Sequence, residues 1–186
     1  MTDEGGGTPG KGSARNRDAE EQSFEGSPAL LKLTETFPEE ILHAHAQHGD
    51  ATCVVKRDRI VDIVTFLRDE PDLSFEMLMD ECGVDRSEHP ERFERFEVVL
   101  HFYSLTHNHR VRVRVAIPED DPKMATLSEL YKGANWFERE IWDMYGIRFE
   151  GHPDLRRLLL YDQFEGHPLR KDYPITRRQP LVGPLN

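Results

Sequence analysis

Cysteine is scarce in this sequence, which contains only two, Cys53 and Cys82, and no CxxC pair. Two isolated thiols cannot form a disulfide framework, an iron–sulfur ligand set or a zinc ribbon. We therefore expect any electron carrier that works with this protein to be held by another chain.

Long apolar runs are also missing. The longest, 98–100 and 158–160, fall far short of the roughly 20 residues that a membrane-spanning helix needs. The N-terminus has neither the basic start and apolar stretch of a secretory signal nor the Arg-rich bias of a transit peptide. With 186 residues, 37% hydrophobic and 32% charged, the chain is expected to form one small domain in a cytoplasm.

Several motifs for phosphate binding and nucleophilic or metal chemistry are absent: GxGxxG, GxxxxGK[ST], GxSxG and HExxH. The net charge of -11 repels phosphate backbones unless positive charge is concentrated in one place. These absences predict no nucleotide-binding loop and no nucleic-acid partner.

The nine histidines offer weak candidates for a metal site. The three within residues 43–48 lie in a stretch whose spacing is typical of a helix. On a helix their side chains would point in different directions and could not bind one ion together. His101, His107 and His109 suggest a stand-alone metal-dependent hydrolase as one hypothesis. No further ligand at suitable spacing and no general base accompany them, so a polar turn at 107–109 is favoured.

Composition divides the chain into three parts. Residues 1–27 hold six of the 13 glycines and few apolar side chains, which predicts a disordered acidic tail. Residues 28–150 carry the hydrophobic patterns of a folded domain. Residues 151–186 are rich in turns, and from Arg156 onward six basic residues outnumber three acidic ones. This favours an extended basic segment that docks on another protein, or an ordinary solvated end.

Hydrophobic spacing predicts a helix over 30–46 that ends near Gly49, then a short β-branched strand at 52–55. A second helix is expected over 60–67, ending before Pro71.

Alternation at 96–105 and 111–117 predicts a β-hairpin around a polar loop. In its second strand, valines and arginines alternate, so one face is expected in the core and the other in solvent. A period near 3.6 predicts helical structure over 127–145, with Gly133 as a candidate break and Gly146 as the C-terminal cap.

The remaining sequence is mostly turn, with a candidate short helix at 155–160 capped by Asp154. The fold class is therefore α+β: a small mixed sheet containing an antiparallel hairpin, covered by helices, with an irregular extended C-terminal segment.

Residues 136–146 hold both tryptophans and are the most unusual stretch of the chain. On a helix, Glu138 and Glu140 point about 200° apart, so they are not expected to form a catalytic carboxylate pair. Arg139 and Asp143 are four residues apart and can pair. Two interpretations stay open for this stretch, an amphipathic helix that fills the core and a face that binds a partner.

A local repeat follows, because Phe-Glu-Gly-His-Pro occurs at 149–153 and again at 164–168, each time before a basic cluster. Gly and Pro fix the turn, which leaves an extended segment suited to lie over another protein, or an ordinary surface loop.

Three consecutive motifs make up this region: Glu138, Arg139, Glu140, Asp143, Tyr145 and Gly146; then Gly151, His152, Pro153, Asp154, Arg156 and Arg157; then Gly166, His167, Pro168, Arg170, Lys171, Asp172, Tyr173 and Pro174. The series resembles the signature of the C subunit of the proton-pumping NADH:quinone oxidoreductase, respiratory complex I, in its unfused bacterial form. The likeness extends over about residues 28–180 and implies that these residues form the family signature and an interface.

The resemblance implies a peripheral-arm subunit with no catalytic, cofactor-binding or metal-binding residues of its own. The complex uses FMN, iron–sulfur clusters, NADH and quinone. The implied partners are the D subunit, chiefly, and the iron–sulfur B and I subunits, on the cytoplasmic face of the bacterial plasma membrane, with membrane contact only through the complex. Arg156, Arg157, Arg170 and Lys171 are predicted to meet acidic groups on a partner. A homologous scaffold subunit of a membrane-bound nickel–iron hydrogenase-type complex is the alternative.

Overall fold

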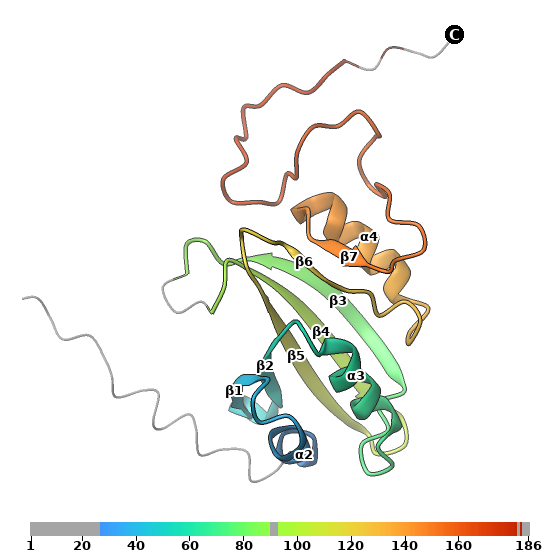
Figure 1. Cartoon of the computed structure of the whole chain (residues 1–186). Coiled ribbons are helices and arrows are strands. Elements are labelled where there is room, and N and C mark those ends of the chain that lie inside the picture. The colour runs from blue at the N-terminus through green and yellow to red at the C-terminus, as the bar shows by residue number, and fades with distance from the viewer. Residues whose placement is uncertain (1–26, 90–92, 182, 184–186) are drawn as a thin grey trace, which may run out of the picture.

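The computed structural model describes residues 27–89, 93–181 and 183, so nearly all of the tail predicted at 1–27 lies outside the described residues. Its centre is a five-stranded sheet with the order β1-β2-β5-β4-β3 (Figure 1). The strands are β1 Ile41–His45, β2 Thr52–Lys56, β3 Met77–Asp85, β4 Phe96–Ser104 and β5 His109–Ile117. Only the β2–β5 pair is parallel among the pairs of this sheet, so the predicted mixed sheet and α+β class are confirmed.

The predicted hairpin is confirmed by β4 and β5, which pair antiparallel from Phe96 with Ile117 to Ser104 with His109. The valines of β5 are buried, whereas Arg112 and Arg114 keep partial exposure. Strict alternation predicts such a strand well because each residue's face depends only on its position along the strand.

Helices α3 Ile60–Asp69 and α4 Ala134–Tyr145 lie on one side of the sheet, and α2 Pro28–Thr36 lies beside β1 (Figure 1). α3 confirms the second predicted helix. α4 confirms the later part of the helix predicted over 127–145 and begins directly after Gly133, where the break was expected. The first part of that prediction is wrong, because residues 127–133 form turns and no helix.

The helix predicted over 30–46 is wrong in its second half, because the chain leaves the helix at Phe37 and forms β1. Pro38 follows directly, and a residue before proline is disfavoured in the helical region. β1 then pairs antiparallel with β2. The partner strand therefore decides the state of residues whose spacing resembled a helix. The rings of His43 and His45 end up 5.6 Å apart on this strand.

Two short strands, β6 Lys123–Ala125 and β7 Arg148–Glu150, form a parallel pair that the sequence did not reveal. The short helix predicted at 155–160 is wrong, because no helix forms there. Beyond β7 the chain from 151 to 181 has no helix or strand and runs back past α4 (Figure 1). We term residues 151–181 the strap.

Candidate docking site: α4 and the strap

Asp143 is fully buried on α4 and fixes the first part of the strap. Its Oδ1 accepts a hydrogen bond from Arg157 Nη1 at 2.6 Å. Its Oδ2 accepts three more from the backbone N–H groups of residues 158, 159 and 160, at 3.1, 2.9 and 2.9 Å. Burial alone would raise the pKa of this carboxyl, but the hydrogen bonds, led by that from residue 160, hold it below its ordinary value. These bonds satisfy the backbone N–H groups of 158–160, in a segment that forms no helix.

The C-terminal end of α4 is capped by the strap. A helix leaves its last carbonyls without intrahelical partners. Here the carbonyl of Asp143 accepts from His167 Nδ1 at 3.0 Å, that of Met144 from the Leu169 N–H at 3.1 Å, and that of Tyr145 from Arg170 Nε at 2.5 Å. The strap and the helix therefore satisfy each other's backbone groups.

Gly146 makes this close approach possible. Its φ is +73°, and its N–H donates to the carbonyl of Trp142 at 2.8 Å, as expected of a helix cap. A Cβ at this position would lie 2.6 Å from the His167 ring and 2.7 Å from Arg170 Nη2.

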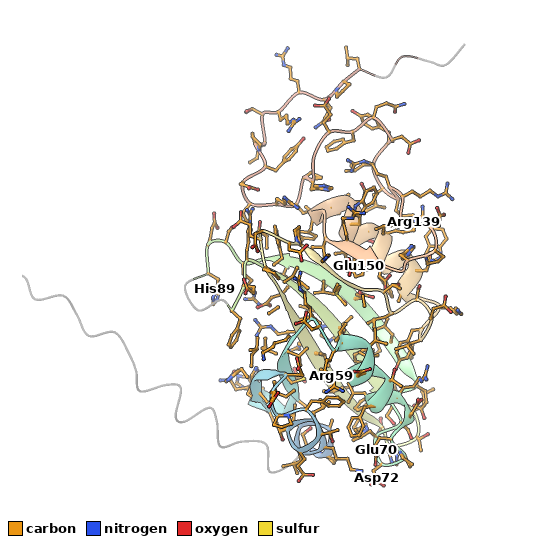
Figure 2. The ribbon with its side chains drawn as sticks, viewed as in Figure 1. Arg59, Glu70, Asp72, His89, Arg139 and Glu150 are labelled. Carbon is orange, nitrogen blue, oxygen red and sulfur yellow. The ribbon has the colours of Figure 1, made fainter. Side chains whose placement is uncertain are left out.

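Arg139 holds the strap at the middle of α4 (Figure 2). Its Nε and Nη2 donate to the carbonyls of Arg156 and Arg157, both at 3.2 Å, and its guanidinium lies over the Trp136 ring. Arg139 and Asp143 therefore do not pair with each other as the spacing allowed. Both are used to bind strap backbone.

The repeat has one structural role in both of its copies. Gly151 and Gly166 have positive φ of 86° and 94°. The histidine after each glycine donates to an α4 carbonyl, His152 to that of Asn135 at 3.0 Å and His167 to that of Asp143. The two copies thus attach the strap to opposite ends of the same helix.

A further attachment joins the strap to the end of β3. The Lys171 N–H donates to Asp85 Oδ2 at 2.9 Å, and the Asp172 carboxylate lies 2.9 Å from Arg95 Nη2. Arg95 also pairs with Asp85 at 3.1 Å and with Glu119. Although burial opposes it, hydrogen bonding from Arg95 and from the Lys171 N–H lowers the pKa of Asp85 to about 2.

Glu138 faces inward instead. Its carboxylate accepts from the Leu127 N–H at 2.6 Å and from Thr126 Oγ1 at 2.5 Å, and burial raises its pKa to about 7. Sequence reasoning missed its neighbour on β3, Glu81, which is buried as well. No motif or hydrophobic pattern of the sequence marks this residue, because its burial follows from the placement of α4 on β3.

The predicted signature residues divide into three groups. Those engaged inside the chain are Glu138, Arg139, Asp143, Tyr145, Gly146, His152, Arg157, His167 and Arg170. Those exposed to solvent are Glu140, Gly151, Pro153, Asp154, Arg156, Lys171, Asp172 and Pro174, while Gly166, Pro168 and Tyr173 are half-buried. Arg157 meets an acidic group of its own chain, Asp143, whereas 70% of the Arg156 side chain is exposed.

The strap exposes large apolar side chains although its backbone is tied down. They are Leu159, Tyr161, Leu169, Ile175 and Leu181. Trp136 of α4 is exposed as well, and its ring lies under the guanidinium of Arg139, which binds the strap backbone. Leu159 is 62% exposed and Ile175 fully so. Together with Arg156, these side chains define what we term the outer face of the strap.

Of the three histidines proposed for a hydrolase, His101 lies on β4, and the other two contact backbone carbonyls. His107 Nε2 lies 2.8 Å from the carbonyl of Pro71 and His109 Nε2 lies 2.9 Å from that of Leu73. Within 27–89 and 93–181, no group of three or more His, Cys, Asp or Glu residues is arranged to hold a metal ion. Nor does any helix in the described part of the chain reach the length and apolarity of a membrane span.

The described residues thus form an α+β domain in which signature residues fasten a C-terminal strap to one helix. The chain belongs to the family described as respiratory-chain NADH dehydrogenase, 30 Kd subunit, whose model matches residues 53–179.

Curated relatives named as the C subunit of NADH-quinone oxidoreductase support this assignment. The protein of Maricaulis maris is 52% identical over 129 residues, which cover 69% of this chain and 62% of the relative. That of Hyphomonas neptunium is 52% identical over 128 residues, covering 69% and 61%. The chain thus matches less than two thirds of the length of these relatives.

Solved structures agree. A trypsin-resistant fragment (1-134) of Nqo5 is 34% identical, with a TM-score of 0.59 over 68% of this chain and 99% of the fragment. A chain of the membrane-bound sulfane sulfur reductase, an archaeal respiratory membrane complex, shares the fold at 23% identity, with a TM-score of 0.63 over 79% and 84%.

Proposed function

We propose that this chain is a non-catalytic peripheral-arm subunit of a proton-translocating NADH:quinone oxidoreductase. That complex passes electrons from NADH through FMN and iron–sulfur clusters to quinone. This chain holds the connecting part of the arm together, chiefly against the D subunit and also near the iron–sulfur B and I subunits. Its location is the cytoplasmic face of the bacterial plasma membrane, as a peripheral component. Membership of the family and the named relatives support this proposal.

One observation carries the docking role: the strap is fixed in its path but turns apolar side chains outward. Ordering an irregular segment costs about 1 to 2 kcal/mol per residue in backbone entropy, and internal hydrogen bonds offset that cost here before a partner arrives. A segment ordered in advance binds with less further loss of entropy. Aromatic side chains and arginine are enriched among interface hot spots, and Trp136, Tyr161 and Arg156 supply these types here.

The charge pattern refines the predicted contacts. Arg157 is already paired with Asp143, so the exposed Arg156 guanidinium and Lys171 ammonium are the basic groups positioned to meet acidic groups of a partner. The exposed side chains of Leu159 and Ile175 would enter apolar pockets of the same partner.

The test is capture of the tagged full-length chain from gently solubilised native membranes, followed by mass spectrometry. We expect recovery of the flavin, iron–sulfur and antiporter-like subunits. A double variant, Arg156→Glu with Leu159→Asp, should reduce that recovery at least tenfold while the chain stays folded. Arg59→Glu is the matched charge reversal, because this exposed arginine lies by α3, away from the strap (Figure 2).

Recovery of a nickel–iron hydrogenase instead would select the alternative complex. A double variant that assembles as well as the wild type would contradict the docking role of the outer face.

A further inference from the structure

Glu81 is the most anomalous side chain among the described residues. It lies on β3, the edge strand of the sheet, and only 3% of the residue is exposed. Neither of its carboxylate oxygens has a hydrogen-bond partner in the described structure. Its cross-strand neighbour is Leu100, which is fully buried. An ionised carboxylate in such surroundings costs several kcal/mol unless it is paired, so buried acids usually bind a proton instead.

The register between β3 and α4 places Glu81 opposite a second acid. Gly83 packs against Ile141 and Tyr145, since a Cβ at Gly83 would lie 2.6 Å from the Tyr145 ring and 3.1 Å from Ile141 Cγ2. Two residues back on the same face of β3 is Glu81, and one turn back on the same face of α4 is Glu138. The two glutamates therefore meet inside the contact between the strand and the helix.

The groups around the pair supply no positive charge that would compensate two carboxylates. Glu138 accepts its hydrogen bonds from a hydroxyl and a backbone N–H. On β3 the titratable groups on either side of Glu81 are Asp80 and Cys82, and neither carries positive charge. From the strap, His152 Nε2 lies 3.9 Å from Glu138 Oε2 but donates to the carbonyl of Asn135. From the rest of α4, Arg139 points to the strap carbonyls.

We propose that Glu81 and Glu138 form a buried proton-binding site between β3 and α4, and that loss of its proton loosens α4 and the strap fastened to it. This inference concerns the chain itself and does not rest on the proposed function.

Electrostatics agree with the geometry. Burial, and then the charge of Glu138, raises the pKa of Glu81 well above its ordinary value. Burial also raises the pKa of Glu138. A carboxyl whose pKa is higher in the folded state binds more protons when folded, so stability is greatest below the unfolded pKa of about 4.5 and falls as pH rises through the folded value. This direction is opposite to that of the hydrogen-bonded Asp143 and Asp85.

The experiment compares full-length wild-type protein with Glu81→Gln between pH 5 and pH 8.5. We expect hydrogen exchange of the backbone amides in α4 and at 158–160, corrected for the intrinsic rate, to become at least tenfold less protected in the wild type as pH rises. Glu81→Gln is neutral at position 81 at every pH and should lose the part of this dependence that Glu81 contributes, and the double variant Glu81→Gln with Glu138→Gln should lose most of it. Glu140→Gln is the matched control, because Glu140 lies on the same helix but is exposed.

An equal pH dependence in Glu81→Gln and wild type would overturn the proposal, as would an equal loss in Glu140→Gln. Carboxyl carbon-13 chemical shifts of Glu81 in the wild type provide a reading that needs no variant. A midpoint above pH 6 supports the proton site, and a midpoint near 4.5 refutes it.

Discussion

The Arg157 guanidinium donates to Asp143 at 2.6 Å and lies between the rings of Trp142 and Phe164, each 5.7 Å from its centre. Its second terminal nitrogen donates to the carbonyls of Phe164 and Gly166. One side chain thus joins the helix to both halves of the strap, and only 13% of that side chain is exposed.

Removal of this guanidinium is expected to release the strap. Arg157→Ala leaves the buried Asp143 carboxylate without its charged partner, and breaking a buried pair costs about 3 to 5 kcal/mol. Urea unfolding should report that loss, and limited proteolysis should cut the strap faster. Arg156→Ala is the control, since its pair with Asp154 is exposed and its loss should change stability by no more than about 0.5 kcal/mol. Equal stability of the two variants would show that Arg157 does not hold the strap.

Gly146 and Gly133 flank α4 and provide a matched pair of alanine substitutions. Gly146→Ala forces a side chain into positive φ and into the His167 ring, so we expect a loss of more than about 1 kcal/mol in the free energy of unfolding. Gly133→Ala has open space and a helical φ of -66°, so it should be neutral or slightly stabilising. Thermal unfolding measures both. If Gly146→Ala is as stable as the wild type, the strap residues that cap α4 can shift without cost.

Asp85 should make the strap end sensitive to acid. Its pKa is lowered from 3.8 to about 2, so it contributes stability that is fully present above pH 4 and is lost as pH falls towards 2. This carboxyl is nearly fully buried, and the contribution is about 2 kcal/mol at neutral pH. Asp85→Asn should lose that stability at pH 7, and its free energy of unfolding, measured by denaturant titration at several pH values, should fall less steeply towards pH 2. If the free energy of unfolding falls as steeply as in the wild type, other carboxyls cause the loss of stability in acid.

Local patterns predicted the elements whose identity depends on neighbours in sequence. The β4–β5 hairpin, α3 and α4 all follow from alternation or a period near 3.6 that a nearby Gly or Pro ends. β1 escaped although its partner β2 is close in sequence, because the spacing of its apolar residues resembled a helix. The β6–β7 pair escaped because its two strands are separated by the 22 residues between Ala125 and Arg148, and no local signal encodes that contact.

The sequence by itself determined the family and the positions of its signature motifs, because these are strings of residue types at fixed spacing. Only the tertiary structure decided how each residue is used. Arg157 and Arg170 of the basic segment, which was expected to meet a partner, bind groups of their own chain, and Arg139 of α4 binds the backbone of that segment. Glu81, which belongs to no motif, became a buried acid through the placement of α4 on β3. Charge is visible in a sequence, but the desolvation and pairing that set its energy depend on which distant surfaces meet in the folded chain.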